Sequence, residues 1–172
     1  NVGIGHTRWA THGLPNDTNA HPHFSSDGNI MLVHNGIIEN YDIIKKELTK
    51  RGHSFQTETD TEVLVHLIEE VYKKSGVSIE EAVRTSLNEV HGAYAIAVIC
   101  KDTPDKIICA RKSSPLVIGV GEDEYYVASD ATPIVEYTKN VVYLEDEQIA
   151  IVDKNNGLRI ISIANVEVSP YI

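Results

Sequence analysis

The stretch GAYAIAVICKDTPDKIICARK, residues 92–112, decides the fold. Its apolar runs 93–100 and 106–111 flank the polar, Pro-containing residues 101–105. Apolar runs of this length, rich in β-branched and small residues and joined by a turn, are typical of a β-hairpin. The sequence therefore predicts an antiparallel pair of strands at this point of the chain.

Short strand-like runs continue on the C-terminal side of this hairpin. Most are separated by turns that contain Gly, Asp or Asn, and they cover residues 116–120, 125–128, 141–144, 148–152 and 158–163. Because strands joined by short turns pair in opposite directions, we expect antiparallel sheets.

Residues 37–91, on the N-terminal side, carry helical signals instead. The segment 40–51 places its apolar residues on one face and is followed by Gly52, a typical helix end. Thr59–Glu62 and Ser78–Glu81 have capping-box spacing, which predicts the start of two further helices. We therefore expect three helices in succession.

These helices are clustered between two strand-rich regions. In the first region, strand-like runs at 1–9 and 30–34 flank a polar loop. The order is typical of an α+β fold, in which helices pack on antiparallel sheets. A doubly wound nucleotide-binding fold is excluded, because Gly119-Val120-Gly121 lacks the third glycine of that motif and no helix follows it.

The composition indicates one globular domain over residues 1–172. Of the 172 residues 42% are hydrophobic, and the net charge of −10 disfavours nucleic acid as a partner. No apolar run reaches the roughly 18 residues of a membrane helix, so we expect no membrane partner. Two cysteines are too few for a disulfide scaffold, and we expect a cytoplasmic protein. Because the chain begins at Asn1 and its one methionine is Met31, we also expect a piece of a longer protein.

Two short motifs offer groups for binding an anion. In HTRWATHG, residues 6–13, Arg8 provides a rigid donor fork for a carboxylate, with the Thr11 hydroxyl beside it. A surface arginine with Trp9 packed beneath it is the alternative. In VHNG, residues 33–36, Asn35 and Gly36 are typical of a tight turn, but their amide and backbone N–H could also stabilise an oxyanion.

Asp60 stands at the start of the second expected helix and has two interpretations. It could cap the helix, or it could bind a substrate ammonium group while Thr59 caps the helix instead.

The histidines suggest a metal site only weakly. His21 and His23 are the best candidates, because alternate residues of a strand point to one face, but Pro22 between them argues against an interior strand. A metal-dependent hydrolase built on His21 and His23 is thus a distant alternative, and we expect no metal and no cofactor. Cys100 and Cys109 lie in apolar runs, where buried, unreactive thiols are expected.

A set of motifs, taken together, resembles one family over about residues 3–160. The motifs are HTRWATHG (6–13), NAHPH (19–23), VHNGIIENY (33–41), TDTEV (59–63), GAYAI (92–96) and SSPLVIG (113–119). They resemble the glutaminase domains, or class II glutamine amidotransferase domains, of the glutamine–fructose-6-phosphate aminotransferase (isomerizing) family. The resemblance implies an N-terminal-nucleophile hydrolase fold, an αββα sandwich of antiparallel sheets, which here would be missing its first strand or strands.

The resemblance also implies a role for each candidate residue. Arg8 and Thr11 would hold the glutamine α-carboxylate, and Asp60 the α-ammonium group. His12 and His21 would line the pocket, and Trp9 would lie on a loop that closes over glutamine. Asn35 and Gly36 would form the oxyanion hole.

The family's nucleophile is an N-terminal cysteine, which this sequence does not carry. We therefore expect the chain as given to be inactive, and a non-catalytic glutamine-binding or structural fragment remains the alternative function. Residues from about 161 to 172 are expected to begin a linker to a C-terminal sugar isomerase domain. The parent enzyme is expected to be a homo-oligomer that releases glutamate and ammonia from L-glutamine for transfer to fructose 6-phosphate.

Overall fold

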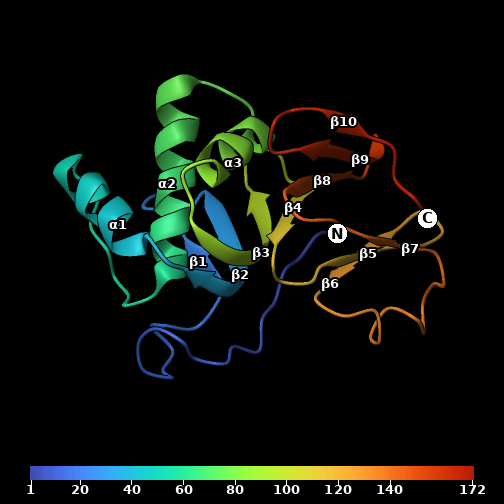
Figure 1. The fold of residues 1–172 in the computed structure, drawn as a ribbon, viewed down its shortest axis with the longest axis horizontal. Helices are drawn as coiled ribbons and strands as arrows, with labels where there is room; N and C mark the ends of the chain where they lie inside the picture. Colours follow the sequence, from blue (N-terminus) through green and yellow to red (C-terminus); the bar gives the residue numbers. More distant parts are fainter.

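The computed structural model describes residues 1–172 and contains two antiparallel sheets and three helices (Figure 1). The helices are α1 (Tyr41–Lys50), α2 (Asp60–Ser75) and α3 (Ile79–Leu87). The strands are β1 (His23–Phe24), β2 (Ile30–Ile38), β3 (Gly92–Cys100), β4 (Lys106–Lys112), β5 (Val117–Val120), β6 (Tyr125–Ala128), β7 (Val141–Tyr143), β8 (Gln148–Asp153), β9 (Gly157–Ser162) and β10 (Glu167–Val168).

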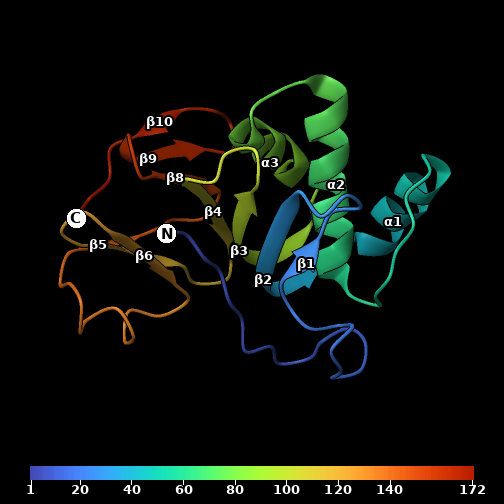
Figure 2. The same cartoon turned by 180° about the vertical axis from the view of Figure 1, so that it is seen from behind.

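The larger sheet has the strand order β1-β2-β3-β4-β8-β9-β10, and the smaller has the order β6-β5-β7. Helices α2 and α3 cover one face of the larger sheet, and the smaller sheet lies toward its other face (Figures 1 and 2). Helical turns at residues 131–138 pack on the outer side of the smaller sheet, at Gly119. The predicted α+β fold with antiparallel sheets is therefore confirmed.

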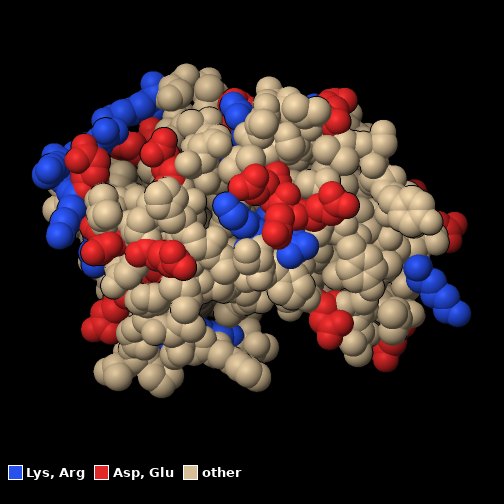
Figure 3. All heavy atoms as spheres, in the orientation of Figure 1, with Lys and Arg blue, Asp and Glu red and all other residues tan.

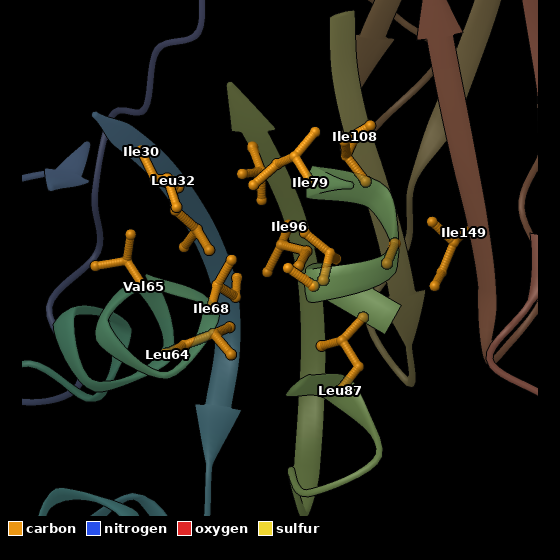
Figure 4. Packing of buried hydrophobic residues seen from close by; sticks show 14 of the residues in the cluster. Ile30, Leu32, Leu64, Val65, Ile68, Ile79, Leu87, Ile96, Ile108 and Ile149 are labelled. Carbon is orange, nitrogen blue, oxygen red and sulfur yellow. The ribbon is translucent and has the colours of Figure 1, made fainter. Parts of the chain in front are cut away.

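Alternation along the central strands explains why the larger sheet has two apolar faces. In β3, Ile96 and Val98 pack toward the helices, whereas Ala95 and Ala97 face the smaller sheet. The same two-residue period divides the other central strands. Figure 4 shows the helix-side layer, in which isoleucines from four neighbouring strands meet aliphatic side chains of α2 and α3.

The predicted helix starts agree with the structure. Thr59 and Ser78 are the N-caps of α2 and α3, and their hydroxyls accept the backbone N–H groups of Glu62 and Glu81 at 3.3 and 3.2 Å. None of the helices combines the length and the apolar character needed to span a bilayer. On the face in Figure 3 acidic and basic side chains are interspersed.

Two predictions for the N-terminal part are wrong. Residues 1–9 form no strand, because their backbone runs beside the body of the molecule without pairing to any other strand. Residues 37–38 are not helical, since β2 continues through them and pairs with β3 as far as Ile38. Asn35-Gly36 is consequently part of β2, paired with β3, and forms no tight turn.

Candidate functional site

A cavity of about 990 Å³ lies where the N-terminal segment, β2, the start of α2 and β6 meet. Its wall contains every candidate residue identified from the sequence: Arg8, Trp9, Thr11, His12, His21, Asn35, Gly36 and Asp60. These residues come from three parts of the chain that are distant in sequence. The fold thus brings all of them to one place.

Asp60 supplies a buried, fixed negative charge to this cavity. Asp60 is only 3% exposed, and its Oδ2 accepts a hydrogen bond from the Ile38 N–H at 2.9 Å. His12 Nδ1 lies 3.7 Å from Oδ1. Because Thr59 caps α2, the Asp60 carboxylate is not needed as a cap and can face a ligand in the cavity.

Asn35 is oriented by a chain of two hydrogen bonds. The Arg8 backbone N–H donates to His6 Nδ1 at 2.9 Å, so this histidine carries its proton on Nε2. His6 Nε2 in turn donates to Asn35 Oδ1 at 2.5 Å. The Asn35 oxygen is therefore engaged, and the donor half of its amide, the NH₂ group, remains available.

Gly36 holds a backbone conformation that requires glycine. Its φ is +119°, and a Cβ atom there would lie 2.3 Å from the Ala93 carbonyl oxygen on the paired strand β3. Asn35 and Gly36 thus follow one another on β2, where it pairs with β3 beside the cavity. A side-chain amide and a backbone N–H in such positions are suitable donors for an oxyanion.

Arg8 supplies the positive charge and also shapes the loop around it. Its two terminal nitrogens donate to the carbonyl oxygens of Leu14 and His12, at 2.9 and 2.7 Å. A guanidinium has five N–H donors, so this bracing does not exhaust them. Trp9, the next residue, borders the cavity and is 91% exposed.

Burial keeps two imidazoles of the cavity wall, His21 and His34, neutral near pH 7. Burial and the neighbouring His6 lower the pKa of His21 to about 3, and this ring stacks on His6 with centroids 4.2 Å apart. Burial also lowers the pKa of His34, whose Nδ1 lies 3.0 Å from Thr61 Oγ1. Arg8 and Asp60 therefore carry opposite fixed charges on a wall otherwise rich in uncharged donors and acceptors.

Neither cysteine can act as a nucleophile in this cavity. Cys100 and Cys109 are both buried, and burial raises the pKa of Cys109 to about 12. Both residues also lie within strands of the larger sheet, as the apolar runs around them predicted.

Sequence reasoning did not identify the supporting residues of the site. His6 orients Asn35 across 29 positions, and His34 reaches Thr61 across 27. The wall contributed by β6 and Ile134 was also missed. Only the two-residue spacing of His6 and Arg8 could have indicated a local contact.

The chain belongs to the glutamine amidotransferase domain family, which it matches over residues 6–136. It is 56% identical to the glutamine–fructose-6-phosphate aminotransferase (isomerizing) of Bacteroides thetaiotaomicron, over 99% of this chain and 28% of the relative. The enzyme of the same name from Pyrococcus horikoshii is 53% identical, over 90% of this chain and 26% of the relative. The chain thus spans little more than a quarter of the curated relatives it matches.

A solved structure supports the same assignment. Glutamine phosphoribosylpyrophosphate amidotransferase of Bacillus subtilis superimposes with a TM-score of 0.75 at 30% identity, covering 92% of this chain and 34% of that one. The arrangement of the two sheets therefore agrees with the N-terminal-nucleophile hydrolase fold that the sequence motifs imply.

Proposed function

We propose that this domain binds L-glutamine and supports hydrolysis of its carboxamide, as the glutaminase part of an enzyme that transfers the nitrogen to fructose 6-phosphate. The observation that carries the proposal is the convergence of Arg8 and Asp60, with opposite fixed charges, on the cavity that also contains Asn35 and Gly36. Glutamine is a zwitterion, and its α-carboxylate and α-ammonium groups match this pair. The names of the curated relatives support the acceptor sugar.

Each wall residue has a task in this proposal. Arg8 and Thr11 hold the α-carboxylate, and Asp60 holds the α-ammonium group. His12 and His21 line the pocket, and Trp9 closes over the bound substrate. The carboxamide carbonyl then lies against Asn35 and Gly36, whose N–H groups stabilise the negative charge of the tetrahedral intermediate.

The attacking group in this proposal is a cysteine thiolate, which adds to the carboxamide carbon and expels ammonia as the C–N bond breaks. Water then hydrolyses the resulting thioester to glutamate and restores the thiol. Because Cys100 and Cys109 are buried, residues 1–172 by themselves are proposed to bind glutamine without hydrolysing it. The seven-stranded sheet extends to Val168, so we place the start of the linker to a sugar isomerase domain after β10. In the parent enzyme, ammonia passes to that domain, and the enzyme assembles as a homo-oligomer.

Calorimetric titration of residues 1–172 with L-glutamine tests the binding step. Arg8→Gln and Asp60→Asn are each expected to weaken binding at least tenfold, because each removes one charge that faces the zwitterion. Arg159→Gln and Glu167→Gln, which neutralise an exposed pair on the outer strands, are the matched controls. Equal affinities in all four variants would overturn the assignment, and so would ammonia release from glutamine by the purified chain.

A further inference from the structure

A second group of ionisable side chains lies outside the glutamine cavity, where the connection after α1 meets α2. His53 belongs to this connection, and His66 and Glu69 lie one turn apart on α2. None of the three lines the cavity described above. Their side chains are nearly buried, with 8%, 3% and 3% exposed for His53, His66 and Glu69.

Each of the three side chains brings one ligand atom close to those of the other two. His53 Nδ1 and His66 Nδ1 are 3.0 Å apart, and Glu69 Oε1 lies 3.7 Å from His53 Nδ1. The three ligand atoms lie within 4.8 Å of one another. In a tetrahedral zinc site with bonds of about 2.0–2.1 Å, two nitrogens are about 3.3 Å apart, so only small movements would seat an ion.

The far nitrogen of each imidazole faces a carboxylate. His53 Nε2 is 2.7 Å from Glu70 Oε2, and His66 Nε2 is 3.9 Å from Glu62 Oε2. Glu70 accepts a hydrogen bond from His53 Nε2, so the Nδ1 lone pair of His53 faces His66 Nδ1. A carboxylate behind an imidazole in this way is the usual support of a histidine that binds a metal ion.

The carboxylates of the cluster are also held in place by side chains outside it. Glu69 is held from outside by Ser26 Oγ at 2.6 Å and by Lys73 Nζ at 3.6 Å. Glu70 contacts Arg51 and Lys74 in the same way, at 3.6 and 2.5 Å.

The site also has a route to solvent. A hollow of about 480 Å³ reaches His66 and Glu62 and is bordered by Gly52, Ser54 and Ser26. An ion can enter through it, and a water molecule can occupy the fourth coordination position.

We propose that His53, His66 and Glu69 bind one zinc ion, which fastens the segment between α1 and α2 to the body of α2. A donor set of two imidazoles and one carboxylate binds zinc in preference to magnesium or calcium. This segment ends at Thr59, next to Asp60 in the cavity wall, so the ion would hold that part of the wall in place without taking part in the chemistry.

Calorimetric titration of chelator-treated protein with ZnCl₂ tests the proposal. We expect one equivalent to bind with a micromolar or lower Kd, Co²⁺ to give the visible absorption of a tetrahedral site, and excess Zn²⁺ to raise Tm by several degrees. His53→Gln, which changes the most exposed of the three ligands, should weaken binding at least 100-fold, and Glu69→Gln at least tenfold.

Two controls separate this site from other histidines. His91→Gln removes an exposed histidine remote from the cluster, and His21→Gln removes one from the glutamine cavity; both should keep the original zinc affinity. Circular dichroism verifies that each variant is folded. Absence of saturable binding at 100 µM ZnCl₂, or equal affinities in His53→Gln and His91→Gln, would overturn the proposal and would assign the short Nδ1–Nδ1 contact to a shared proton.

Discussion

Replacement of Gly36 by alanine tests whether the donor pair on β2 depends on its backbone. The added Cβ would lie 2.3 Å from the Ala93 carbonyl oxygen and 2.7 Å from the Ala93 carbonyl carbon. Both atoms belong to the backbone of β3, so no side chain can rotate away. Either β2 and β3 separate locally, or Gly36 leaves its φ of +119°.

The expected cost has two parts. Holding alanine at a sparsely populated positive φ costs about 1–3 kcal/mol, and overpacking against a fixed backbone costs about 1–3 kcal/mol more. Gly36→Ala should therefore lower the free energy of unfolding by about 2–6 kcal/mol. Since small domains have about 5–15 kcal/mol in total, the variant should remain folded at low temperature.

Gly76→Ala is the matched control, because it isolates the conformational part. Gly76 ends α2 with a φ of +61°, and a Cβ there would meet nothing within 4 Å. Its cost should be about 1–2 kcal/mol, so Gly36→Ala is expected to cost about 1–3 kcal/mol more than the control.

Urea unfolding followed by far-ultraviolet circular dichroism measures both variants, with an unchanged slope confirming that only stability has changed. Fluorescence is less suitable, since the single tryptophan, Trp9, is 91% exposed. If the two variants differed by less than about 0.5 kcal/mol, well below the overpacking cost, the close approach of β2 and β3 at Gly36 would be refuted.

Three further changes address other features of the site. Thr59→Ala should destabilise the protein by about 1–2 kcal/mol and weaken glutamine binding, whereas Ser78→Ala, which uncaps α3, should affect only the urea midpoint. The folded-state pKa of His21 is about 3, below its unfolded value of 6.5, so its contribution to the free energy of unfolding is complete above pH 6.5 and is lost as the pH falls toward 3. His21→Gln should therefore make the acid-induced fall in the urea midpoint shallower. In a domain that carries an N-terminal cysteine, Asn35→Asp should lower glutaminase turnover at least about 100-fold with little change in glutamine affinity by calorimetry, and turnover within about threefold would remove Asn35 from the proposed oxyanion hole.

Local signals were sufficient for most of the secondary structure. The hairpin of β3 and β4 and the N-caps Thr59 and Ser78 were predicted within one residue, because apolar alternation and capping depend on neighbours in sequence. Residues 1–9 have the composition of a strand, but a strand also needs a partner with unpaired backbone groups. The two-residue strands β1 and β10 are too short to produce a pattern at all.

Asn35-Gly36 shows why the site was harder to predict than the fold. In local terms the pair favours a tight turn. The structure places both residues in β2, opposite Ala95 and Tyr94, so pairing with a strand some 60 positions away determines their conformation. The turn-forming glycine is used instead for close approach of two strands.

The orientation of Asn35 depends on a similar long-range relation. Its amide can present either an oxygen or an NH₂ group to a ligand, and these have opposite effects on a developing oxyanion. His6 decides between them by donating to the oxygen, and His6 is itself fixed by the Arg8 N–H. The residue proposed to bind the substrate carboxylate therefore also sets, through one imidazole, which atom of Asn35 faces the opposite end of the substrate. A disturbance of the loop at Arg8 should consequently impair turnover as well as binding, a coupling that no spacing of residues in the sequence could reveal.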